Sequence, residues 1–325
     1  MKIFLVIGIC MTLLGIGMCG VSRAMGFHGS FGITSGLKYV ELDDEDSSIP
    51  KTKLDPFTDI DGRIDACSVE LVPSDGYYIE YKGTSEMGYA VENGSLNLNG
   101  PGAAETKTNW YVLYMSDFRR GFFVGTGHGN GDVLRVYYPE GEKLDRVRIT
   151  SGLGDISADE LSCAELELIT SMGNIEINNT AAEAITARSD MGNIHINDLQ
   201  GESADIEVSM GEIVIKDVRL SQLDMTNSFG NIEAEDIYAE NITAENDCGD
   251  TEINDFSVTG SLTVMSDLGD VELSPKGNAK KYSLDLETEL GRVRVKGRNY
   301  GSTAVVDNVG PEVRVRNSNG DIDVR

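Results

Sequence analysis

A short motif recurs along this chain at a nearly constant spacing, and that repetition constrains the fold more than any other feature. The motif is a glycine, followed in most copies by Asp or Asn and then an apolar residue. Seven glycines carry it, with five spacings of 19 residues and a last spacing of 20: Gly154, Gly173, Gly192, Gly211, Gly230, Gly249 and Gly269. Weaker copies follow at Gly291, Gly310 and Gly320. A period this short and regular indicates a solenoid in which each copy forms one stacked turn.

Apolar and polar residues alternate at three places in each copy of the motif. In the copy that begins at Gly173, the apolar positions are Ile175 and Ile177, Thr180 and Ala182, and Ile185 and Ala187. Alternation with period two indicates strands that turn one face to the core. We therefore predict an all-β fold, a single-stranded parallel β-helix with three short strands per turn and turns about 4.8 Å apart.

Each glycine of the motif is expected to form a corner of the turn at positive φ, where a side chain would be strained. We expect the coil to be right-handed, because the hexapeptide signature of left-handed coils is absent. A β-sandwich is the alternative all-β architecture, but it would not require a fixed spacing.

The amino-terminal residues Ile3 to Ser22 form one hydrophobic segment of about the length that crosses a bilayer. Lys2 precedes the segment, so the positive-inside rule places the remainder of the chain outside the cytoplasm. We predict a single-pass cell-membrane protein with an extracytoplasmic C-terminal domain. A cleaved signal peptide is the alternative, because Ser22, Arg23 and Ala24 loosely fit a cleavage site.

Changes in sequence texture divide the chain into four parts. Residues 1–25 are the transmembrane anchor or signal peptide, and residues 26–63 form an acidic juxtamembrane linker. Residues 64–145 form a β-rich lead-in of the solenoid. Residues 146–325 form the repeat β-helix with a basic C-terminal cap.

The composition excludes several classes of function. The chain has 54 Asp and Glu against 27 Lys and Arg, a formal charge of −27, so it would repel nucleic acid. Its five cysteines (Cys10, Cys19, Cys67, Cys163 and Cys248) form neither a disulfide framework nor a zinc-binding pattern. We expect no cofactor.

Several segments, in a fixed order, resemble a known family. They are ACSVELVPSDGYYIEYKG at Ala66–Gly83, GSLNLNG at Gly94–Gly100, VLRVYYPEGEKLDRVRITSGLGDI at Val133–Ile156 and the repeated glycine motifs. From Ile64 to Arg325 the chain resembles the bacterial putative adhesin family, a domain of unknown function. The resemblance implies a β-solenoid, often behind one membrane helix, with an adhesive or stress-sensing scaffold role. It supplies no functional residues.

A column of polar residues lies six positions after the motif glycines: Glu160, Asn179, Asp198, Asp217, Asp236 and Asp255. A second column, one position after the glycines, runs from Asp155 to Asp270. Oxygen ligands from neighbouring turns could hold Ca²⁺, with Asp198, Asp217, Asp236 and Asp255 as the candidates. The alternative is that Asp and Asn cap backbone N–H groups at the corners.

The charge reverses in the last part of the chain. Arg292, Arg294, Lys296 and Arg298 are predicted to alternate along one strand and share a face. That face could contact an anionic wall polymer or the acidic end of another copy. The alternative is a solvated cap over the last strand edge.

No residue pattern indicates catalysis. The glycine-rich stretch 125–131 precedes a strand rather than a helix, so it predicts a hairpin connection and not a phosphate-binding loop. Acidic residues occupy so many outward positions that no particular carboxylate pair indicates a glycosidase. We predict a non-catalytic, membrane-anchored surface scaffold or adhesin-like binding protein, whose partners are a cell-wall polymer or an envelope protein. The alternatives are a self-assembling or stress-sensing envelope protein and, third, a glycan-active enzyme.

Overall fold

The computed structural model describes residues 47–83, 86–100, 132–277 and 279–325. It also gives the backbone of three short strands, β1 (Phe31–Thr34), β2 (Tyr39–Glu41) and β9 (Trp110–Tyr111), which form an antiparallel sheet in the order β2-β1-β9. This small sheet belongs to one compact unit and the solenoid to a second. The predicted anchor Ile3–Ser22 and the stretch 125–131 lie outside the described residues. Within the described residues, no helix has the length and apolar character needed to cross a membrane.

The solenoid consists of strands and a single 3₁₀ turn, with no α-helix among its described residues. Its first strands are β3 (Ile49–Lys53), β4 (Asp59–Ala66), β5 (Ser68–Ser74), β6 (Tyr78–Lys82), β7 (Gly88–Glu92), β8 (Ser95–Asn99) and β10 (Val133–Pro139). The repeat forms β11 (Lys143–Leu153), β12 (Ile156–Asp159), β13 (Ser162–Met172), β14 (Ile175–Met191), β15 (Ile194–Met210), β16 (Ile213–Arg219), β17 (Gln222–Phe229), β18 (Ile232–Cys248), β19 (Thr251–Leu268) and β20 (Val271–Pro275). The last elements are η1 (Ala279–Lys281), β21 (Ser283–Leu290), β22 (Val293–Val295), β23 (Arg298–Asn299), β24 (Thr303–Val306), β25 (Glu312–Asn319) and β26 (Ile322–Val324).

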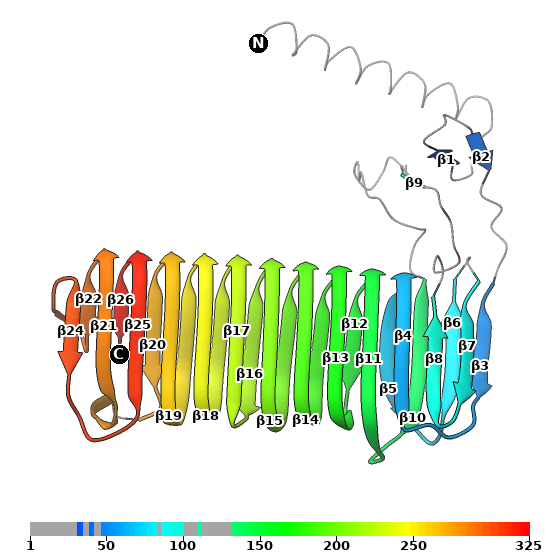
Figure 1. Ribbon diagram of the computed structural model, residues 1–325, viewed down its shortest axis with the longest axis horizontal. Coiled ribbons are helices and arrows are strands. Elements are labelled where there is room, and N and C mark those ends of the chain that lie inside the picture. Colours follow the sequence, from blue (N-terminus) through cyan, green and yellow to red (C-terminus); the bar gives the residue numbers. More distant parts are fainter. Residues whose placement is uncertain are drawn as a thin grey trace, which may run out of the picture. The chain divides into compact units, whose positions relative to one another are not determined.

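Successive copies of the motif stack directly on one another, as the spacing predicted (Figure 1). Ile175 pairs with Ile194, and Ile194 pairs with Ile213, in parallel register. All three side chains are buried in one continuous core. Because no turn can bury its own apolar edge, each turn depends on its neighbours for stability.

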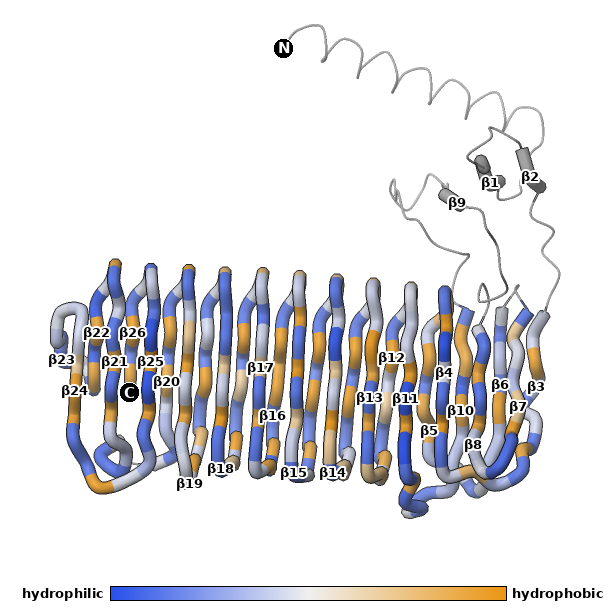
Figure 2. The backbone as a smooth tube through the Cα atoms, in the orientation of Figure 1, coloured by the Kyte–Doolittle hydropathy of each residue, from blue (hydrophilic) through white to orange (hydrophobic). Residues whose placement is uncertain are grey.

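Three segments of alternating burial make up each turn, and the alternation shifts at three corners, one of them at two consecutive exposed residues such as Glu183 and Ala184. Figure 2 shows the corresponding apolar and polar stretches along the stacked strands. The motif glycines bend the chain at φ of 139° to 154°, which confirms the predicted positive φ. A Cβ on Gly211 would lie 2.2 Å from the carbonyl oxygen of Gly192, so only glycine fits between stacked corners. Six residues later the chain bends again at a residue in the left-handed region, such as Asp217 at φ 55°. This left-handed conformation at the second corner was not predicted from the sequence.

A polar column runs inside the core, three positions before the motif glycines. Its members are Ser151, Thr170, Ser189, Asn227, Asn246, Ser266, Thr288 and Asn317, all buried, and Val208 interrupts it. Several satisfy carbonyl groups of the glycine corner: Asn227 Nδ2 donates to Gly211 O at 3.0 Å, and Ser189 Oγ donates to Gly173 O at 3.0 Å. These side chains therefore pair carbonyl groups of the tight corner, whereas the hydroxyls of Ser151 and Ser266 in the same column have no hydrogen-bond partner among the described residues.

The amino-terminal end of the solenoid begins earlier than the predicted boundary at residue 64. Strands β3 and β4 lie within the stretch expected to be a linker, and β4 with β5 forms a turn that pairs in parallel with β11 and β12. Beyond that turn, β8 and β10 are followed by β7 and β6, which run antiparallel to them, and β3 pairs with β6. Antiparallel strands thus close this end of the parallel coil.

The carboxyl-terminal end does not follow the order of the sequence. The last turn, β25 with β26, lies between the turn β19–β20 and the turn β21–β22 and pairs in parallel with both (Figure 1). Antiparallel strands β24 and β23 pair with β21 and β22 on the outer side. The prediction that the basic terminal residues form the end cap is therefore wrong in part, because residues 312–324 are inserted into the coil. Gly310, expected to mark a turn, precedes β25 instead.

Candidate functional site

The four aspartates predicted as calcium ligands occupy the second corner of four consecutive turns. Asp198, Asp217, Asp236 and Asp255 have φ of 54°, 55°, 56° and 50°. Asp and Asn adopt this left-handed conformation more readily than other residues with a side chain. The corner conformation is therefore sufficient to explain why the column is made of Asp and Asn.

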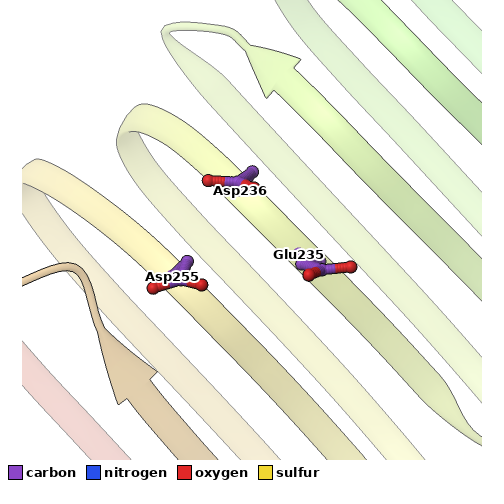
Figure 3. A group of neighbouring side chains, drawn as sticks. All are labelled: Glu235, Asp236 and Asp255. Carbon is purple, nitrogen blue, oxygen red and sulfur yellow. The ribbon is translucent and has the colours of Figure 1, made fainter.

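Two of these aspartates are brought together with a third carboxylate. One oxygen each from Glu235, Asp236 and Asp255 lies within 4.8 Å of the other two (Figure 3). Glu235 comes from the end of the straight segment that precedes the corner, and sequence analysis did not include it. The sequence did offer one signal for Glu235. It is the last outward residue before the corner at Asp236, so its side chain lies beside that of Asp236.

Two lysines already contact this carboxylate cluster. Lys276 Nζ lies 2.9 Å from Asp236 Oδ1 and 4.7 Å from the centre of the Tyr238 ring. Lys216 Nζ lies 2.9 Å from Glu235 Oε2. Hydrogen bonds to Tyr238 and Asp236 raise the pKa of Lys276, and the hydrogen bond to Glu235 raises the pKa of Lys216. Both ammonium groups therefore stay charged and offset part of the repulsion among the three carboxylates. Ca²⁺ binding at this cluster remains one of the two alternatives predicted from the sequence.

The second polar column, one position after the motif glycines, forms hydrogen bonds from turn to turn. Asp155 Oδ1 accepts from the backbone N–H of Asn174 at 2.7 Å, and Asn174 Oδ1 accepts from that of Asn193 at 2.9 Å. Asp250 Oδ1 accepts from the N–H of Asp270 at 2.8 Å in the same way. These side chains cap backbone groups, as the alternative to calcium predicted, but they cap the next turn rather than their own.

A third set of acidic side chains lines one outward sheet face, and we call it the acidic column. It consists of Glu233, Glu252, Glu272 and Asp323, which pair in register across β18, β19, β20 and β26. Glu233 and Glu252 are exposed, and Glu272 contacts Arg325. Neighbouring rungs are about 4.8 Å apart, where two like charges repel by about 1 kcal/mol in water. The fold thus holds negative charges in a line on an accessible surface.

The four basic candidates do not share one strand, so that prediction is wrong. Arg292 and Arg294 flank Val293 and both contact Asp321, at 3.0 and 3.1 Å. A tight turn with positive φ at Lys296 and Gly297 then reverses the chain. Arg298 lies on the antiparallel strand β23, with its guanidinium 5.2 Å from the Tyr300 ring. Period-two alternation predicted a strand here but could not locate the hairpin.

The other residues that the sequence singled out are buried cysteines, an exposed histidine and half-exposed methionines. Cys67 and Cys163 are buried, and burial raises the pKa of each thiol to about 12, so neither is a ready nucleophile. His195 is exposed on the outer face, as predicted. Met191 and Met210 stack in register before their glycines but are 42% and 50% exposed, so they are only half covered at the corner.

A shallow depression lies between β4, β8 and β11, with a volume of about 250 Å³. Asp59, Asp61, Arg146 and Arg148 line it. Arg146 and Arg148 reach across to Glu165 and Glu167, at 2.9 and 2.6 Å. The two arginines of this depression therefore belong to a surface ion-pair network that continues onto the next turn.

The fold and these columns define an acidic, all-β solenoid whose polar groups are repeated from turn to turn. The family model described as Toastrack DUF4097 matches residues 68–325, so the chain belongs to this family, a domain of unknown function. The predicted resemblance to the bacterial putative adhesins is confirmed. No curated protein matches the sequence.

Three of the solved structures that match this chain have low sequence identity to it. A protein from Bacteroides fragilis described as a "putative adhesin" is 13% identical, with 87% of this chain and 99% of that chain covered and a TM-score of 0.44. A "putative lipid binding protein" from Parabacteroides distasonis is 13% identical, with 87% and 98% covered and a TM-score of 0.49. A "putative cell adhesion protein" from Clostridium sporogenes is 11% identical, with 86% and 99% covered and a TM-score of 0.26.

Proposed function

We propose that this protein is a non-catalytic scaffold of the cell envelope, anchored by Ile3–Ser22, that binds an extended cationic partner along the acidic column. The observation that carries the proposal is the register of Glu233, Glu252, Glu272 and Asp323, which places one carboxylate per turn on a single face. Such a surface offers regularly spaced carboxylates in a line, of which Glu233 and Glu252 are exposed and Glu272 is paired with Arg325. That arrangement suits a repetitive partner better than a compact small molecule.

The sign of the charge selects the partner. Carboxylates held one rung apart repel each other, and a partner that carries ammonium or guanidinium groups relieves that repulsion. The overall charge of −27 adds long-range attraction for a cationic partner and repels anionic polymers. Among the predicted partners, an envelope protein with a basic extended segment fits this surface best.

End-to-end self-assembly is less well supported than partner binding. Antiparallel strands β6, β7 and β3 close one end of the coil, and β23 and β24 close the other. A second copy could therefore not continue the parallel stacking directly. A catalytic role would need a carboxylate pair in a groove, and in the part of the chain that the structure describes the depression beside β4 has its two arginines in ion pairs with the next turn.

Binding to isolated cell envelopes tests the proposal. The full chain should bind envelope fragments and the defined probe poly-L-lysine, with affinity that falls as salt rises. The double variant Glu233→Lys/Glu252→Lys should lose most of this binding. The matched control Asp205→Lys/Asp224→Lys also changes two acids that pair in register, but on another face. Equal loss in both variants, or no binding to either target, would contradict the proposal.

A further inference from the structure

The inserted turn, residues 312–324, fills a slot between the turn β19–β20 and the turn β21–β22. These two turns follow each other in sequence but do not pair with each other directly. On one side Val313 pairs with Leu262 and Ile322 pairs with Val271. On the other side Val313 pairs with Leu284 and Ile322 pairs with Val293. Without this segment, two parallel strand edges would face each other unpaired. The slot is therefore a strand-acceptor site that the protein's own chain occupies.

The slot recognises more than an extended backbone. Val313, Val315, Ile322 and Val324 are buried in it. Asn317 Nδ2 donates to Gly269 O at 2.8 Å, and the backbone N–H of Asp321 donates to Asp270 Oδ1 at 2.7 Å. A segment that makes these contacts carries apolar residues, a side-chain hydrogen-bond donor and a glycine corner at fixed positions.

Charge makes the slot specific for this segment. Arg316 Nη2 donates to Asp285 Oδ2 at 2.6 Å, and Arg316 also contacts Glu287. Arg314 contacts Asp285 at 3.4 Å. In the turn of β15, the positions that correspond in register to Arg314 and Arg316 are Asp205 and Glu207. Acidic side chains at these positions would be repelled by Asp285 and Glu287 of β21. The two arginines thus fix both the identity and the register of the inserted turn.

The connection to the inserted turn lies on the surface. Residues 307–311 link β24 to β25, with Val309 fully exposed and Pro311 directly before the strand. The segment from a second copy can make the same contacts as the segment in cis, which is the condition for exchange between copies. We propose that two copies of this chain exchange residues 312–324 through the strand-acceptor site and so form a dimer. This inference is independent of the proposed envelope partner.

Two charge-reversed full-length chains test the exchange. The donor variant is Arg314→Glu/Arg316→Glu, and the acceptor variant is Asp285→Arg/Glu287→Arg. Alone, each variant places like charges across its own slot. Mixed, reciprocal exchange restores opposite charges in both slots. Native mass spectrometry should show a heterodimer at least about tenfold more abundant than either homodimer. A mixture that stays monomeric, or that forms homodimers equally well, would overturn the proposal.

The unmodified chain provides a test that does not depend on the folding of these variants. Isotopically heavy and light copies of the full chain, incubated together at high concentration, should form dimers of mixed mass. The control is the same chain with Glu272→Cys/Asp323→Cys cross-linked, which ties the inserted turn to its own neighbour, since these positions pair in register. Cross-linking should reduce the mixed dimer about tenfold if exchange is required. Absence of mixed dimers, or equal amounts with and without the cross-link, would contradict exchange.

Discussion

The side-chain amide of Asn317 donates a hydrogen bond to the carbonyl of Gly269 at 2.8 Å, although 48 residues separate the two in sequence. At Thr170, Ser189 and Asn227 of the column the equivalent bond joins residues 16 apart, as from Ser189 to Gly173. The same local interaction therefore holds sequential turns together and fixes the inserted turn in place. The same buried polar contact therefore forms between turns that are consecutive in sequence and between turns that are not.

Replacing a corner glycine should destabilise the solenoid strongly. In Gly211→Ala the new Cβ would meet Gly192 O at 2.2 Å, at a φ of 146° that L-residues rarely adopt. We expect a loss on the order of 3 kcal/mol in the free energy of unfolding, measured by urea denaturation. The control Gly141→Ala has φ 76° with open space around it, and should cost about 1 kcal/mol. Similar losses in both variants would show that stacking does not restrict the corner.

The second corner should tolerate glycine better than a branched residue. Asp217 has φ 55° and is exposed, so its side chain contributes little packing. Asp217→Val should lower the free energy of unfolding by about 1–2 kcal/mol, whereas Asp217→Gly should change it by only a few tenths. If both variants lost the same stability, the aspartate would act through its carboxylate rather than through its conformation.

The carboxylate cluster at the second corner allows a direct test of calcium binding. Lys216 and Lys276 already contact the cluster of Glu235, Asp236 and Asp255. We therefore expect the melting temperature of the full chain to be the same with a chelator and with millimolar CaCl₂. A calcium-dependent rise that disappears in Asp236→Asn/Asp255→Asn would instead assign the cluster as a cation site.

How much of this architecture the sequence predicted depends on the range of the interaction. The core file through Ile175, Ile194 and Ile213 followed from a local period, because in-register stacking repeats the same environment every turn. The left-handed corner at Asp217 was missed, although a recurring Asp or Asn is a signal for that conformation. The inserted turn could not be found from periodicity alone, because a period does not specify which turns are neighbours. Two spacings after Gly269 depart from 19 residues, 22 to Gly291 and 10 from Gly310 to Gly320, and they were the available sign.

Acid should loosen the strand-acceptor site. Hydrogen bonding from Arg316, with the charge of Arg314 nearby, lowers the pKa of Asp285 below its usual value. Because the folded pKa is below the unfolded value near 4, this contribution is present above about pH 4 and is lost as the pH falls through the folded pKa. Hydrogen exchange of residues 312–324 should therefore accelerate at low pH. Asp285→Asn should flatten this dependence, while Asp224→Asn, at a carboxylate that accepts from Gln222, should leave it unchanged.

Cross-linking of paired cysteines most directly tests the central claim that turns stack in register with residues 312–324 inserted. In a Cys248→Ser background, a short bifunctional thiol reagent should join Glu272→Cys to Asp323→Cys, which are register partners. The pair Glu272→Cys and Arg294→Cys should not react, because Asp323 lies between these two positions. Efficient cross-linking of Glu272→Cys to Arg294→Cys, with none to Asp323→Cys, would show that the turns stack in sequence order and would contradict the account.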